Sequence, residues 1–104
     1  MAQFDVFVNP IENARRGYPF VVAMQSDLTV NDAEQLVAPI ASSDLGRSAS
    51  RRVMPVVALH GNDHVVVVPR LTVMRSRDLI EKVSSIATAR AELLAAVDYL
   101  FFGV

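Results

Sequence analysis

The segment HGNDH, residues 60–64, holds the densest set of possible metal ligands in the chain, two imidazoles and one carboxylate. Imidazole and carboxylate groups are common ligands of zinc. Apolar runs on either side of a short Gly-containing loop predict a β-hairpin with His60 and His64 on paired strands. Two ligands do not complete a structural site, so we interpret the segment as an exposed hairpin and expect no bound metal.

The possible nucleophiles are serines in one polar segment, because the chain contains no cysteine. A catalytic serine requires a strained turn such as G-x-S-x-G and a His–acid pair that activates it. That pattern does not occur, and small polar residues in this density are typical of a loop. We therefore expect no catalytic residue and no cofactor. The serines concerned are Ser42, Ser43, Ser48 and Ser50.

Arginines gather in two polar stretches that we predict to be loops, residues 11–19 and 43–52. Guanidinium groups can pair with carboxylates and phosphates. The alternative interpretation is that these arginines are scattered over the surface and only increase solubility. The residues concerned are Arg15 and Arg16 in the first loop and Arg47, Arg51 and Arg52 in the second.

The whole chain carries a formal net charge of −1, from ten basic and eleven acidic residues. A molecule with this balance has no overall field that would attract nucleic acid. We therefore expect no direct nucleic-acid binding by this chain alone.

The sequence ends on AAVDYLFFGV, ten residues with a single charge among them. Hydrophobic residues make up 52% of the chain, and its mean hydropathy is +0.33. No apolar run approaches the ~20 residues that span a bilayer, and the N-terminus has no signal-peptide pattern. The apolar excess therefore predicts an oligomer, most simply a homodimer, with no membrane contact. The lack of cysteine fits a cytoplasmic location.

Most of the chain has the pattern of β-strands. Residues 3–8 alternate apolar and polar side chains, and residues 19–25 are apolar enough for a strand buried on both faces. Pro39 places the third strand on a sheet edge or at a bulge. Residues 71–83 leave strand and helical turn both open. The predicted strands are 3–8, 19–25, 34–42, 54–60 and 64–69, with a three-residue loop, 61–63, between the last two.

From Ser84 onward the period changes to that of an amphipathic helix. Ser84 or Ser85 can cap its start and Gly103 can end it. We therefore predict a single domain, residues 1–104, that is mainly β, with a small antiparallel barrel-like sheet closed by one C-terminal helix. The expected inward face of the helix consists of Leu93, Leu94, Val97, Leu100, Phe101 and Val104.

On a wheel of roughly 100° per residue, Phe102 lies about 140° from Val97, and Tyr99 about 160° away on the other side. These two aromatic side chains therefore cannot both reach the core. With Asp98 beside them, they indicate a contact patch for another protein. The alternative is that a second protomer covers them.

Several short motifs, in order and spread over the whole length, resemble the CcdB family of toxin–antitoxin toxins. They are QF-V at 3–6, QSDL at 25–28, VAPIA at 37–41, MPVV at 54–57 and FFGV at 101–104. The resemblance implies a homodimer with the antiparallel barrel-like sheet of the CcdB, Kid and MazF toxins, and no enzymatic activity.

The resemblance also implies a function. Proteins similar to this one bind the A subunit of DNA gyrase and trap the complex of gyrase with cleaved DNA. The family's contact positions correspond here to Leu28, Thr29, Asp98, Phe101, Phe102, Gly103 and Val104. Three of them depart from the family pattern: Phe102 replaces a Trp, Asp98 an Asn and Thr29 an Ile.

A CcdA-like antitoxin is the second partner that the resemblance implies, and the complex of both proteins would repress its own transcription and serve plasmid maintenance. The antitoxin's disordered, acidic C-terminal segment would suit Arg15, Arg16, Arg47, Arg51 and Arg52.

Two other functions stay open. A non-toxic CcdB homologue would keep antitoxin binding after losing gyrase contacts. An endoribonuclease toxin of the Kid or MazF type would use the arginines of residues 43–52 with Asp44, although no catalytic motif of those families matches this sequence.

Overall fold

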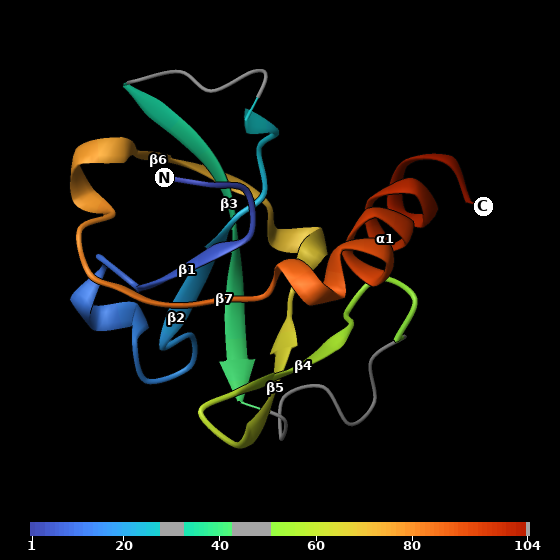
Figure 1. Cartoon of the computed structure of the whole chain (residues 1–104), viewed down its shortest axis with the longest axis horizontal. Helices are drawn as coiled ribbons and strands as arrows, with labels where there is room; N and C mark the ends of the chain where they lie inside the picture. Colours follow the sequence, from blue (N-terminus) through green and yellow to red (C-terminus); the bar gives the residue numbers. More distant parts are fainter. Residues whose placement is uncertain (28–32, 43–50, 104) are drawn as a thin grey trace.

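The computed structural model describes residues 1–27, 33–42 and 51–103. In this part of the chain, seven strands form one antiparallel sheet in the order β4-β5-β3-β2-β1-β7, and β6 pairs with β3. The sheet curls into a half-barrel, and helix α1 lies at one end of it (Figure 1). The mainly β fold with one C-terminal helix is therefore as predicted. The strands are β1 (Asp5–Val8), β2 (Phe20–Ala23), β3 (Glu34–Ser42), β4 (Val56–Leu59), β5 (Asn62–Val66), β6 (Thr72–Arg75) and β7 (Lys82–Ser85).

Short 3₁₀ turns and one helix connect and complete the strands. The turns are η1 (Glu12–Ala14), η4 (Val68–Arg70), η5 (Ser76–Asp78) and η6 (Ala87–Ala89), and the helix is α1 (Arg90–Phe102). Residues 71–83, which the sequence left open, contain β6, the turn η5 and the start of β7. The sheet does not close on itself, because β4 and β7 each have one neighbour in the described chain.

The core lies on both faces of β2, as the apolar pattern of residues 19–25 predicts. Val22 packs into the cluster beneath α1, whereas Val21 and Ala23 pack with Leu79 on the other face. A strand buried on both sides reads as a continuous apolar run because neither face meets water. The sheet is therefore covered by α1 on one side and by the β6–β7 connection on the other.

The prediction for Pro39 is wrong, because β3 is a central strand that pairs with β2 through Val21 and Pro39. On its other side β3 pairs with β6 up to Val37 and with β5 from Ile40 onward. The Pro39 carbonyl oxygen, which accepts from the Val67 amide at 2.9 Å, points to that second side. The missing N–H of Pro39 would point to this same side, at the place where the partner of β3 changes from β6 to β5. The proline therefore removes no hydrogen bond between paired strands.

The hairpin at residues 54–69 is correct in outline, but its loop has two residues instead of three. Leu59 pairs with Asn62, so His60 and Gly61 form the turn, with φ of 52° and 81°. Positive φ at both central residues matches a type I′ turn, whose twist suits paired strands. His60 therefore lies in the turn and not on a strand.

Helix α1 begins later than predicted. Its N-cap residue, Ala89, makes no side-chain cap, and the Ser85 hydroxyl accepts from the Ala87 amide in the preceding turn. Its end is as predicted: Gly103 has φ 74°, and its amide donates to the Tyr99 carbonyl. A left-handed residue at this position favours glycine, which has no Cβ to clash.

The predicted inward face of α1 is largely wrong. Leu93 and Ala96 are fully buried, and Val97 packs partly against the same cluster. Leu94, Leu100 and Phe101, also expected inside, are exposed. At ~100° per residue, the centre of the buried side, midway between Leu93 and Ala96, lies about 70° around the helix axis from Val97. The last turn also projects beyond the described strands of the sheet (Figure 1).

Candidate functional site

The side of α1 opposite the core carries an exposed apolar surface, which we call the α1 face. It consists of Leu94, Asp98, Phe101 and Phe102, all exposed, with the small side chains of Ala91 and Ala95 beside them. On the helical wheel these residues lie about 110° or more from the direction of Leu93 and Ala96. The α1 face therefore contributes nothing to the core.

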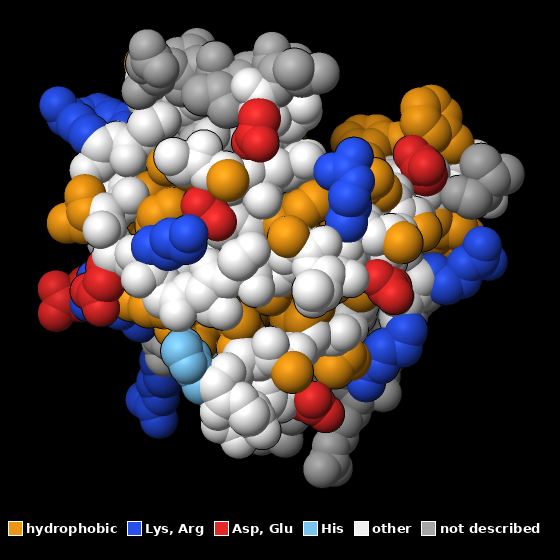
Figure 2. All heavy atoms as spheres, viewed as in Figure 1, with side chains coloured by type: hydrophobic (Ala, Val, Ile, Leu, Met, Phe, Trp, Pro, Cys, Tyr) orange, Lys and Arg blue, Asp and Glu red, His pale blue; other side chains and the backbone are white. Residues whose placement is uncertain are grey.

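The two phenylalanines dominate this surface. Phe101 is 64% exposed and Phe102 is 74% exposed. Figure 2 shows hydrophobic side chains gathered over the C-terminal end of the helix with an acidic side chain among them. The expected outward position of Phe102 is confirmed, and Phe101 joins it. Adjacent exposed rings at one helix end are typical of a protein-binding surface.

Asp98 brings a negative charge into this apolar surface. It forms no hydrogen bond or ion pair with any described residue. A carboxylate that loses water without a cationic partner costs several kcal/mol. The α1 face therefore suits a partner that offers Arg or Lys opposite Asp98.

Hydrogen bonds of Gln3, which precedes β1, connect the start of α1 to the QSD segment. The Gln3 side chain accepts from the Arg90 guanidinium at 2.9 Å and donates to the Met24 carbonyl at 3.0 Å. The Gln3 amide also donates to the Asp27 carboxylate at 2.7 Å. Sequence reasoning missed the role of Gln3 and Arg90, although Gln3 and Asp27 belong to the motifs QF-V and QSDL.

Tyr99 belongs to a different surface from Phe102. Its ring is half-buried, and the Arg52 guanidinium lies 3.9 Å from the ring centroid, in cation–π contact. Arg51 and Arg52 line a shallow groove with Glu92, Ala95 and Tyr99. These two arginines of the predicted antitoxin contacts therefore lie directly beside α1.

The other predicted basic contacts lie elsewhere. Arg15 and Arg16 follow η1, at the end of the molecule opposite α1 (Figure 1). The structure therefore separates the predicted arginines into two groups. Four predicted contacts, Leu28, Thr29, Arg47 and Val104, lie outside the described residues, as does Asp44 of the ribonuclease alternative.

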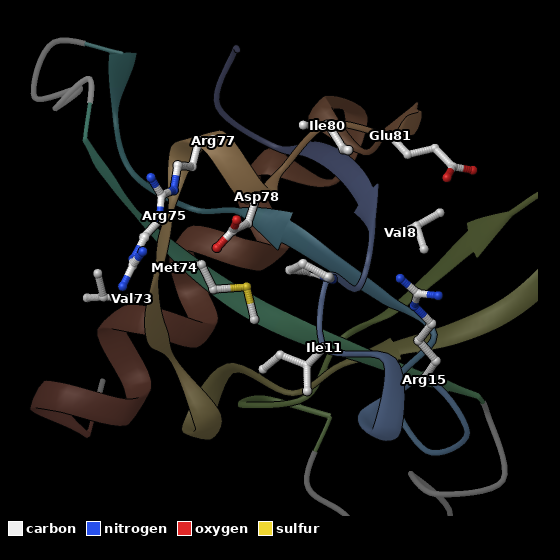
Figure 3. Close-up of a pocket in the computed structure, with 11 residues that line it drawn as sticks. Val8, Ile11, Arg15, Val73, Met74, Arg75, Arg77, Asp78, Ile80 and Glu81 are labelled. Carbon is white, nitrogen blue, oxygen red and sulfur yellow. The ribbon is translucent and has the colours of Figure 1, made fainter.

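Arg15 lines an open hollow with a volume of about 600 Å³. Arg75 and Arg77 lie together at one side of it and Arg15 at the other, with Ile11, Met74 and Asp78 between (Figure 3). We call this hollow the basic groove. Sequence reasoning missed it, because β6 and η5 fell in the segment whose structure was left open.

The hairpin histidines are separated by their positions. His60 is in the turn, while His64 packs edge-on against Phe20 with ring centroids 5.6 Å apart. Among the described residues, no group of three or more His, Cys, Asp or Glu side chains could hold a metal ion.

The fold defines a class, a small and mainly antiparallel β protein with one C-terminal helix. A scan against protein families matches CcdB, described as CcdB protein, over residues 3–103. The chain therefore belongs to the CcdB family, that of toxins from toxin–antitoxin pairs. No curated protein matches the chain. Within the described ranges, none of its helical segments has the length and hydropathy to cross a membrane.

Proposed function

We propose that this chain is a CcdB-type toxin that binds the A subunit of DNA gyrase and traps gyrase on cleaved DNA. The observation that carries the proposal is the pair of exposed rings, Phe101 and Phe102, at the end of α1. Aromatic residues on a rigid helix are frequent anchors of protein interfaces. Phe102 keeps the flat apolar ring of the family's Trp but lacks its N–H donor.

The active form in this proposal is a homodimer that presents two α1 ends. Leu94 and Phe101 extend the apolar surface away from Phe102 along α1, which gives a second protomer room to pack beside the target site. Leu28 and Thr29, which match contact positions of the family pattern, would complete the target contact. The protein acts by binding and not by catalysis.

A CcdA-like antitoxin neutralises the toxin in this proposal. Its acidic segment binds Arg15, Arg16, Arg47, Arg51 and Arg52, and the toxin–antitoxin complex represses its own operon. Arg51 and Arg52 lie in the groove beside Tyr99, so a segment bound there passes close to the α1 face.

Expression in two hosts tests the target. One host has native gyrase and the other has a substitution in the toxin-binding region of its gyrase A subunit. Growth arrest in the first host alone, with retention of a gyrase A fragment by the purified chain, is the expected result.

The same experiment distinguishes the alternatives. Arrest in both hosts, with cleaved transcripts and intact DNA, would identify a ribonuclease. Absence of arrest in both hosts would identify a non-toxic relative. The charge of Asp98, where the family pattern has an amide, favours this alternative.

A further inference from the structure

The basic groove is bordered by apolar side chains that the core does not use. Ile11, Val73 and Ile80 are 54%, 55% and 84% exposed, and all three line the groove. Single exposed hydrophobic residues are normal on a protein surface. Three around one hollow mark a place where another molecule can bury them.

The charged groups of the groove are available for binding. Its cations are Arg15, Arg75 and Arg77, and its acids are Asp78 and Glu81. None of the five forms an ion pair with a described residue; the ion pair between Lys82 and Asp5 involves no residue that lines the groove. Three guanidinium groups against two carboxylates leave an excess of positive charge, so the groove favours an acidic occupant.

Both walls of the groove are held by contacts with buried residues. Buried Asn9 accepts from the Ile11 amide and donates to the Tyr18 carbonyl, each at 2.9 Å. The Asn9 carbonyl oxygen accepts from the Arg15 Nε at 2.6 Å, which leaves the terminal guanidinium nitrogens for a ligand. On the opposite wall, buried Leu79 anchors the η5 turn to the core. A site already ordered in the free protein loses little entropy on binding.

We propose that the basic groove is a docking site for an acidic polypeptide segment with apolar residues at intervals, contacted by Arg75 and Arg77 and by Ile11, Val73 and Ile80. A second copy of this chain is a poorer occupant. Its α1 face would bind head to tail, and such contacts form open chains unless the rotation closes a ring. The proposal rests on the proposed function only in naming the antitoxin as the source of the segment.

The test uses the full chain and a short fluorescein-labelled peptide that alternates Glu and Leu, with a Lys–Leu peptide as the charge control. Anisotropy titrations should show that the Glu–Leu peptide binds, more weakly at high salt. The double substitution Arg75→Glu and Arg77→Glu should weaken binding by about tenfold or more. The matched control is Arg70→Glu, because Arg70 is exposed on η4 and lines no groove described here.

Substitution of Ile80 tests the apolar part. Ile80→Ser should reduce peptide affinity severalfold, and circular dichroism should show an unchanged fold because the side chain is 84% exposed. Three outcomes overturn the proposal: no binding of the Glu–Leu peptide at low salt, equal weakening by Arg70→Glu, or a change of oligomeric state in Ile80→Ser. Failure of gyrase retention would overturn the proposed target and leave this site standing, because the peptide titration uses no gyrase.

Discussion

Phe101 and Phe102 are neighbours in the sequence, yet the helical period predicted opposite positions for their side chains. The apolar spacing predicted Phe101 inside and Phe102 outside, whereas both rings are exposed. The last turn of α1 extends past the sheet, so the side on which a residue falls no longer decides its burial there. Side chains in this projecting turn can therefore contact a partner whichever side of the helix they lie on.

Replacement of Phe102 by alanine should separate binding from folding. Phe102→Ala should leave the free energy of unfolding within about 0.5 kcal/mol, because a surface side chain makes few contacts. The same change should cost more than about 1 kcal/mol of affinity for the gyrase A fragment, as a central aromatic anchor does. Chemical denaturation and calorimetric titration measure the two quantities. Substantial unfolding would show that the ring supports the core.

Replacement of Asp98 by asparagine tests what the partner offers to this carboxylate. If the target presents Arg or Lys opposite Asp98, Asp98→Asn should weaken binding by about tenfold and reduce its dependence on salt. Titrations at low and high ionic strength measure both effects. A gain in affinity would instead show that the target prefers the amide found in the family pattern.

At the scale of elements, α1 is held by a small number of buried contacts. Leu93 and Ala96 are fully buried, and the Gln3–Arg90 hydrogen bond fixes the first turn. These contacts set the direction in which the α1 face points. The first two turns of α1, which make these contacts, therefore determine both the stability of the helix and the orientation of the α1 face.

Replacement of Leu93 should be far more damaging than replacement of Phe102. Leu93→Ala should lower the free energy of unfolding by about 2–5 kcal/mol through lost burial and a cavity. Leu94→Ala is the matched control, since the same truncation on the exposed side should cost about 1 kcal/mol or less. Urea unfolding of both variants measures the difference. Equal losses would contradict the assignment of the buried face.

How far the sequence predicted this fold depends on the element. The bounds of β3, residues 34–42, were predicted correctly, because an apolar run between polar ends is typical of a strand that the sheet buries on both faces. The inward face of α1 was misplaced because apolar residues lie on both of its sides: Leu93 and Ala96 serve the core, Leu94 and Phe101 the surface. Periodicity alone cannot distinguish these two uses. The basic groove, assembled from residues on either side of η1 and from β6 and η5, depends on tertiary pairing that no local pattern contains.

At the scale of the whole molecule, the two candidate surfaces lie at opposite ends. The α1 face occupies one end, and the η1 and η5 turns that bound the basic groove occupy the other (Figure 1). No residue is shared between them. Sites that are far apart and share no contacts change independently, within about 0.3–0.5 kcal/mol.

The two surfaces should therefore respond to substitution separately. Phe102→Ala should leave affinity for the Glu–Leu peptide within about twofold, and Arg75→Glu with Arg77→Glu should do the same for the gyrase A fragment. The variant that combines all three substitutions should lose as much affinity for each ligand as the parent variant that lacks the corresponding contact. Titrations of all three proteins with both ligands measure this. A larger departure would reveal a structural connection through the sheet.

The unclosed sheet has a consequence for how this chain behaves in concentrated solution. Strand borders with free amide and carbonyl groups can recruit other chains and start fibrous aggregates. Here β4 is four residues long and directly follows Pro55, while β7 carries the charged Lys82 at its start. Short length, proline and lysine are the features that block such recruitment. In a protein that is half hydrophobic by composition, the borders at β4 and β7 are thereby protected against the growth of intermolecular β-structure.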